Sequence, residues 1–237
     1  MIDVPGRPGW RLAVTADAEQ AGVLAAGAVA RALRGRLVRR PRALLALSGG
    51  SSPLPMLRAL TVAPRVRWPR IDVLQVDERC VPSDDPDRNL AMLRRELLDH
   101  VPASVHPLRV EHEDGPDGAA AAAGVELAGL LDGDAPLDVV HLGLGADGHT
   151  ASLFPDAPEL DELDRPVVAT VDAHAGHRRL TLTWPVLDRA RRVVLLAPGA
   201  DKLEALRGVL AGDPDLPASR LAADRVLVVT DHDPLGR

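Results

Sequence analysis

A short apolar segment at residues 137–142 runs directly into a turn that contains three glycines. The segment includes adjacent β-branched residues and is bounded by turn residues, which is typical of a buried strand. Gly143, Gly145 and Gly148 let the backbone turn sharply at the carboxyl end of this strand. Open α/β sheets bind their ligands at that end of their strands. The feature therefore predicts an α/β fold with a ligand site directly after residue 142.

Asp147 and His149 lie within the same glycine-rich turn. A carboxylate beside an imidazole can hold the orientation and the tautomer of the ring, so the pair is suited to general-base chemistry. This interpretation predicts an active site in which His149 accepts a proton. The alternative is a structural turn that carries a solvated Asp and a solvated His, and the segment alone leaves both open.

The turn also matches G-x-G-x-x-G, the glycine pattern of dinucleotide-binding proteins. In those proteins the third glycine opens a long crossover helix. Here Pro155 and Pro158 leave room for little more than one helical turn after His149. Asp147 would also place a negative charge beside the pyrophosphate. We therefore reject nicotinamide and flavin binding, and no cofactor is predicted.

Strand-like and helix-like segments alternate along the whole chain. The predicted strands are residues 10–15, 42–47, 71–76, 137–142, 166–171, 180–183, 192–197 and 225–230. The predicted helices are residues 17–34, a segment that starts at Pro53, and residues 89–98, 117–131 and 201–210. This alternation indicates a mostly parallel sheet with helices on both faces. Because 237 residues suit one large α/β domain and no linker is visible, we expect a single domain over residues 1–237.

The charge and the aromatic content argue against a nucleic-acid-binding protein. The formal net charge is −6, and the few aromatic residues offer no platform on which bases could stack. One segment is nevertheless basic, and we interpret it as a solvated helix end. It contains Arg31, Arg34, Arg36, Arg39, Arg40 and Arg42.

The sequence shows no membrane-spanning run and no signal peptide, so a cytoplasmic protein is expected. Its one cysteine, Cys80, excludes an internal disulfide. His and acidic residues gather at residues 106–114 and acidic residues at 84–87, but neither group has a recognised ligand spacing. No metal is predicted.

The loop that contains Ser48, Gly49, Gly50 and Ser51 lies between a predicted strand and a predicted helix. Its glycines admit close approach of a ligand, its backbone N–H groups are free, and the dipole of the following helix favours an anion. The loop lacks the spacing of a nucleoside triphosphate site. It therefore predicts a phosphate-binding loop, with a purely structural turn as the alternative.

Lysine and asparagine each occur only once in the chain, at Lys202 and at Asn89. Since arginine is used almost everywhere else as the cation, a surviving lysine is a candidate for a chemical role, although accident is the alternative. Both residues follow predicted strands and begin predicted helices, and we expect them at the same edge of the sheet as His149.

These segments, in this order, resemble the 6-phosphogluconolactonase family over nearly the whole chain. The family's motifs correspond to residues 48–53 (SGGSSP), 77–82 (DERCVP), 143–155 (GLGADGHTASLFP) and 179–183 (RLTLT), followed by Gly199 and Lys202. The motif at 143–155 is highly specific. The chain departs from the family at Ser52, where threonine is usual, and at Arg88, which replaces a serine and leaves that serine's contact unassigned.

The resemblance implies a Rossmann-like α/β fold and hydrolysis of 6-phospho-D-glucono-1,5-lactone, the second step of the oxidative pentose phosphate pathway. His149 would activate the attacking water and Asp147 would orient its ring. The groups that stabilise the oxyanion are not assigned, and neither a nucleophilic serine nor a metal is implied. The substrate and its phosphate would be bound by Ser48, Gly49, Gly50, Ser51, Arg79, Asn89, Gly145, Arg179 and Lys202.

Two rival functions share this fold. Glucosamine-6-phosphate deaminases also carry a strand followed by Gly-x-Asp-Gly-His, but a stretch with Asn-Glu-Pro replaces residues 150–155 in them. Sugar-phosphate-sensing regulators normally add a helix-turn-helix module, for which this chain has no spare length. The expected partner is a small sugar-phosphate lactone, with no obligatory protein partner, nucleic acid or membrane.

Overall fold

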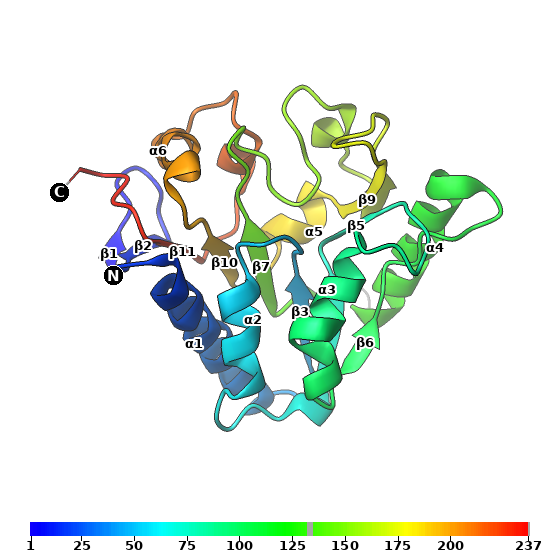
Figure 1. Cartoon of the computed structure of the whole chain (residues 1–237), viewed down its shortest axis with the longest axis horizontal. Helices are drawn as coiled ribbons and strands as arrows, with labels where there is room; N and C mark the ends of the chain where they lie inside the picture. The colour runs from blue at the N-terminus through cyan, green and yellow to red at the C-terminus, as the bar shows by residue number, and fades with distance from the viewer. Residues whose placement is uncertain (132–134, 237) are drawn as a thin grey trace.

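The computed structural model of the chain describes residues 1–131 and 135–236. Within these residues an eight-stranded sheet forms the centre of the molecule, in the order β1-β2-β11-β10-β7-β3-β4-β6 (Figure 1). All neighbouring strands in it run parallel except the short β1, which pairs antiparallel with β2. The strands are β1 (Ile2–Asp3), β2 (Trp10–Val14), β3 (Ala43–Leu47), β4 (Ile71–Gln75), β6 (Ser104–His106), β7 (Val139–Gly143), β10 (Val193–Leu196) and β11 (Val226–Thr230).

Helices cover both faces of this sheet, as the alternating pattern predicted. One face packs against α1 (Ala18–Leu37), α2 (Leu54–Thr61) and α3 (Asn89–Glu96). The other packs against α4 (Gly115–Leu130), α5 (Trp184–Asp188) and α6 (Leu203–Ala211). The predicted start of the first helix is confirmed, because the Asp17 side chain accepts a hydrogen bond of 2.7 Å from the Gln20 N–H. No described helix is long and apolar enough to cross a membrane.

A second, three-stranded sheet differs from the sequence-based prediction. It contains β5 (Asp77–Arg79), β8 (Val167–Ala169) and β9 (Arg179–Leu182), all paired antiparallel. Two segments predicted to join the parallel sheet, 166–171 and 180–183, belong to it instead. The short connection at residues 170–178 contains no helix, and a parallel pair would need a longer crossover. The strands β1 and β6 and the helix α5 were not predicted.

The order of the strands places the predicted site at one end of the molecule. The strands β3 and β7 are neighbours, so the loops after residues 47 and 143 lie side by side at their carboxyl ends. The strand β5 follows the end of β4 and carries Asp77 and Arg79 beside the same loops. The N-termini of α2 and α3 point into the same region, where anions are favoured.

Candidate active site

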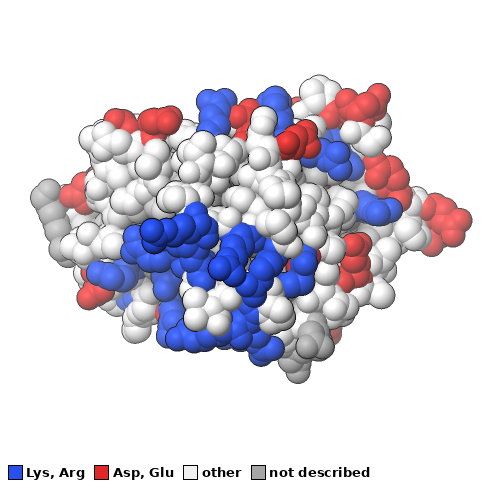
Figure 2. Space-filling view, turned by 90° about the horizontal axis from the view of Figure 1, so that it is seen from below, with Lys and Arg blue, Asp and Glu red and all other residues white. Residues whose placement is uncertain are grey.

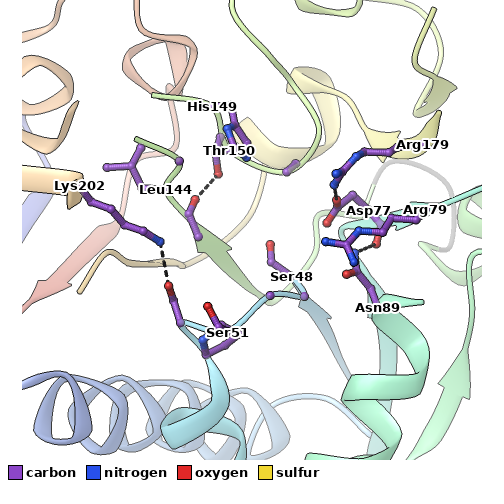
Figure 3. A pocket seen from close by; sticks show the side chains of 17 residues that line it. Ser48, Ser51, Asp77, Arg79, Asn89, Leu144, His149, Thr150, Arg179 and Lys202 are labelled. Atoms are coloured by element: carbon purple, nitrogen blue, oxygen red, sulfur yellow. Dashed lines mark hydrogen bonds and ion pairs between the residues drawn. The ribbon is translucent and has the colours of Figure 1, made fainter. Parts of the chain in front are cut away.

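A cavity of about 290 Å³ opens at the carboxyl ends of β3 and β7 (Figure 3). Every sequence-predicted site residue lines it except Asp147. The cavity also contains residues that were not predicted to bind substrate, which are Ser52, Pro53, Asp77, Gly143, Leu144, Thr150 and Ala151. Segments that lie far apart in the sequence thus meet at one end of the sheet, as expected.

His149 and Asp147 form a hydrogen-bonded pair at the rim of this cavity. Nδ1 of His149 lies 2.5 Å from Oδ1 of Asp147, and the same oxygen accepts a hydrogen bond of 3.1 Å from the His149 N–H. Burial raises the pKa of the Asp147 carboxyl, but the hydrogen bond and charge of His149 outweigh this effect and the net pKa is lowered. With Nδ1 directed at a carboxylate, Nε2 is the ring nitrogen left to accept a proton.

Glycines hold this pair in place. A Cβ at Gly145 would collide with the His149 ring and the Asp147 carboxylate, and Gly148 has φ +79° with Leu216 packed against it. The turn closes through a hydrogen bond of 2.8 Å from the Gly145 N–H to the His149 carbonyl. The glycines that the sequence displays are therefore required by close approach as well as by backbone conformation.

His141 lies eight positions before His149 on the chain but has a different environment. It is fully buried within β7, and burial lowers its pKa to about 3. The ring is therefore neutral and out of contact with solvent. Of the two histidines in this segment, only His149 lines the cavity.

An aromatic stack supports the ring of His149. Phe154 lies between two histidines, with ring centroids 4.5 Å from His149 and 3.5 Å from His174. Sequence reasoning missed this contact. Phe154 is the single phenylalanine of the chain, so the argument from rare residues used for Lys202 could have found it. His174, in the loop between β8 and β9, is one of eight histidines, so the argument from rare residues could not have found it.

Cationic side chains lie on facing walls of the cavity. On one wall, Nζ of Lys202 donates a hydrogen bond of 2.8 Å to Oγ of Ser52, at the end of the glycine-rich loop (Figure 3). Burial lowers the pKa of Lys202, against a smaller opposing effect of the nearby Asp201. On the opposite wall lie Arg79 and Arg179. An anion bound between the walls would compensate positive charge on both sides.

The two arginines are held by contacts on their outer side. Nη1 of Arg79 donates to the Asp87 carbonyl at 2.8 Å, and Nη2 of Arg179 donates to the His174 carbonyl at 3.2 Å. Nη1 of Arg179 also lies 3.8 Å from the buried Asp77 carboxylate. Burial is the main reason that the pKa of Arg179 is lowered. These contacts direct both guanidinium groups along the cavity wall.

Comparison with known proteins identifies the family. Residues 16–229 match the model described as glucosamine-6-phosphate isomerases/6-phosphogluconolactonase. The chain belongs to this family. It is 40% identical to the 6-phosphogluconolactonase of Mycobacterium tuberculosis, over 85% of this chain and 87% of that protein. It is 39% identical to the 6-phosphogluconolactonase of Mesorhizobium japonicum, over 85% of both chains.

Solved structures of family members share the fold. The 6-phosphogluconolactonase of Trypanosoma brucei superposes with a TM-score of 0.80, at 28% identity over 94% of this chain and 96% of that chain. A monomeric glucosamine-6-phosphate deaminase superposes almost as well, with a TM-score of 0.78 over 95% and 98% of the two chains, but at 22% identity. The fold is therefore common to both activities, and the sequence has to distinguish them.

In this family member Arg88, the residue before Asn89, points away from the cavity. Its side chain is buried, with Nε 3.7 Å from Glu78 and Nη2 3.4 Å from Glu111. It does not line the cavity, so it does not supply the contact of the serine that usually stands there. Asn89 does line it, and its Nδ2 donates to the Asp77 carbonyl at 3.0 Å.

The side chain of Glu78 supports this wall of the cavity through several hydrogen bonds. Its fully buried carboxylate accepts hydrogen bonds from the N–H groups of Arg79, Asn89 and Leu90, at 2.7, 2.8 and 2.9 Å. Nε2 of Gln75 donates to it at 2.7 Å. The carboxylate thus caps the N-terminus of α3 although it lies eleven positions earlier than Asn89.

Glu78→Gln is therefore expected to lower the free energy of unfolding by about 1–3 kcal/mol. The glutamine side chain would direct an NH₂ group toward backbone N–H groups that donate to a carboxylate in the wild type. Urea denaturation measures the change. Glu111→Gln is the matched control, because Glu111 also pairs with Arg88 but its side chain is 52% exposed. Equal stabilities of the two variants would contradict the capping role of Glu78.

Proposed function

We propose that this protein is a 6-phosphogluconolactonase, which hydrolyses 6-phospho-D-glucono-1,5-lactone to 6-phospho-D-gluconate in the oxidative pentose phosphate pathway. Relatives of that name are about 40% identical over 85% of the chain. The observation that carries the proposal is the His149–Asp147 pair at the rim of a cavity with cations on two facing walls. A base and several cations that line one cavity suit a phosphorylated ester.

His149 acts as the general base in this mechanism. Nε2 takes a proton from a water molecule while the water oxygen attacks C1 of the lactone. The tetrahedral intermediate then breaks the bond between C1 and the ring oxygen, and the imidazolium returns its proton to that oxygen. Asp147 holds the ring in the required tautomer and stabilises its charged form. The products are a carboxylic acid and the hydroxyl group of an open chain.

Backbone N–H groups are the candidates for stabilising the oxyanion. The turns that contain Gly49, Gly50 and Gly145 line the cavity, and the N–H groups of such turns donate to negative oxygen atoms without cost in side-chain entropy. A Cβ at Gly49 would collide with the side chain of Asn89, so close packing requires glycine there.

The phosphate is assigned to the cations on the facing walls of the cavity. Lys202, Arg79 and Arg179 would bind it together with the backbone of Gly50 and Ser51, while Ser48, Gly49, Asn89 and Gly145 contact the remainder of the substrate. The support is their common position on the cavity wall. Ser48 is buried and its Oγ donates to the His141 carbonyl at 3.2 Å, which leaves its oxygen able to accept from a substrate hydroxyl.

A direct assay tests this proposal. Acid release from freshly generated phosphogluconolactone should exceed the spontaneous rate in proportion to enzyme concentration. Ammonia release from glucosamine 6-phosphate should be absent. A lactone rate equal to the spontaneous one, or deamination of the amino sugar, would overturn the assignment.

Exhaustive chelation is expected to leave this activity unchanged, because water activation is assigned to an imidazole. Within the described residues, no three His, Cys, Asp or Glu side chains gather as metal ligands. The measurement is the lactonase rate before and after dialysis against EDTA. Activity that EDTA removes and a divalent ion restores would replace the scheme above by a metal-bound water.

Three further expectations stay predictions. They are that residues 1–237 act as one catalytic domain, that the enzyme works in the cytoplasm, and that it needs no protein partner. The match of one family model to residues 16–229 supports the first.

A further inference from the structure

A second cavity, larger than the active-site cavity, lies at the opposite end of the parallel strands. Its volume is about 880 Å³. It is bounded by one side of α1 and by residues that directly precede or begin β2, β7, β10 and β11. These are the amino ends of the parallel strands, whereas the active site is at their carboxyl ends. We call this cavity the basic cleft.

Arginines surround the basic cleft. They are Arg11, Arg31, Arg36, Arg39, Arg191, Arg192 and Arg225. Figure 2 shows this side of the molecule, where several groups of Lys and Arg side chains gather in the centre and lower part of the view. The chain as a whole carries a net charge of −6, so the concentration of positive charge here is local. The arginine run on α1 was interpreted as a solvated helix end, but Arg31, Arg36 and Arg39 of that run line a cavity.

The sheet register forces two of these arginines together. Val193 and Val226 are paired across β10 and β11, and Arg192 and Arg225 directly precede them. Adjacent strands are about 4.8 Å apart, so the two guanidinium groups start from neighbouring positions. Arg31 approaches from α1. Burial lowers the pKa of Arg192, and the positive charges of Arg225 and Arg31 lower it further.

The acidic side chain of the cleft already forms ion pairs with two of the arginines. Among the described residues that line it, Asp138 is the only acid, and it pairs with Arg36 at 2.5 Å and with Arg191 at 3.4 Å. In the described part of the chain no carboxylate lies within ion-pair distance of Arg31, Arg192 or Arg225. Three like charges without a counter-ion repel one another, so their arrangement destabilises the folded protein unless an anion joins them.

We propose that the basic cleft is a binding site for an organic polyphosphate, of the class of a nucleoside triphosphate. Guanidinium groups pair bidentately with phosphate oxygens, and three unpaired arginines suit more than one phosphate group. The volume lies in the range of sites for small organic ligands. Leu24, Ala28 and Ala32 of α1 give the cleft an apolar wall for the remainder of the molecule.

The observations favour a small molecule over a nucleic acid. The arginines line a concave cavity and the overall charge of the protein is negative, which opposes binding of a long polyanion. Among the residues that the structure describes, no aromatic side chain lines the cleft for stacking of single-stranded bases.

Titration calorimetry at low ionic strength tests the proposal. The probes are ATP, inorganic triphosphate and adenosine, with and without saturating 6-phosphogluconate. The wild type should bind ATP and triphosphate saturably at one site, with no effect of 6-phosphogluconate, and adenosine should bind at least tenfold more weakly. Added salt should weaken binding because it screens the charges.

Variants locate the site. Arg31→Gln with Arg225→Gln removes two exposed charges and should weaken ATP binding at least tenfold. Arg192→Gln should have a similar effect and should not lower the melting temperature of the ligand-free protein. Arg94→Gln with Arg109→Gln is the matched control, because both arginines are exposed and line neither cavity. Its affinity for ATP should equal that of the wild type.

Several results would overturn the proposal. They are the absence of saturable binding at millimolar ATP, equal losses in the cleft variant and in the control, and competition by 6-phosphogluconate, which would place ATP in the active site. Tighter binding of a single-stranded oligonucleotide than of ATP, sensitive to the same variants, would identify a nucleic-acid surface instead. Lactonase activity does not enter this test, so its outcome is independent of the proposed function.

Discussion

His149→Ala is expected to lower kcat by about a hundredfold or more, since removal of a general base typically costs that much. The motivation is geometric: Nδ1 is engaged by Asp147 at 2.5 Å, which leaves Nε2 as the ring nitrogen that can accept a proton. The measurement is kcat on freshly generated phosphogluconolactone, corrected for spontaneous hydrolysis. The melting temperature should stay close to that of the wild type, because the side chain lies at the rim of the cavity.

The chain offers a matched control for this variant. His232 also directs its Nδ1 at the preceding carboxylate, Asp231, at 2.8 Å, but it lies outside the active-site cavity. His232→Ala should therefore retain wild-type turnover. Asp147→Asn should lower kcat by a smaller factor than His149→Ala, because the base remains but its tautomer is no longer fixed. Wild-type turnover in His149→Ala would remove the residue from the mechanism.

Lys202→Ala is expected to reduce kcat/KM for the phosphorylated lactone by roughly 1.5–3 kcal/mol, the range for a hydrogen bond to a charged group. Lys202 is half-buried and its ammonium group meets a single hydroxyl group, that of Ser52. A phosphate oxygen would place a negative charge in direct contact with the ammonium group. Most of the loss should appear in KM if Lys202 only binds the phosphate.

Unphosphorylated gluconolactone is the substrate that isolates this contact. It should be poor for the wild type and should lose much less from Lys202→Ala, because it never made the interaction. Arg207→Ala, on the exposed side of α6, removes a nearby cation outside the cavity and should leave both substrates unaffected. Equal damage to both substrates in Lys202→Ala would place Lys202 at C1 or in the fold.

Local patterns in the sequence were sufficient to predict that Asp147 and His149 form a pair. Asp147 and His149 are two positions apart on a turn whose glycines are visible in the sequence, and a backbone that turns so tightly brings their side chains together. The parallel strands other than β6 were also predicted, because buried strands between amphipathic helices have a recognisable hydrophobic pattern. The placement of Lys202 at the same end of the sheet followed from its position after a strand.

Contacts between distant segments were decided by tertiary packing alone. Lys202 meets Ser52 across 150 positions, and Glu78 caps a helix that begins eleven positions later. Periodicity assigns a residue to a strand, but it does not state which strand becomes its neighbour. Segments 166–171 and 180–183 were therefore recognised as strands and assigned to the wrong sheet.

The arginine run on α1 shows most clearly which properties the sequence determined and which the tertiary structure decided. The sequence alone determined its charge and its place at the end of a helix, since both are properties of one segment. The register of β10 and β11 brought Arg192 and Arg225 to the same cleft as Arg31. Charges interact through space, so only the folded chain decided which arginines share a cavity and which have no acid beside them.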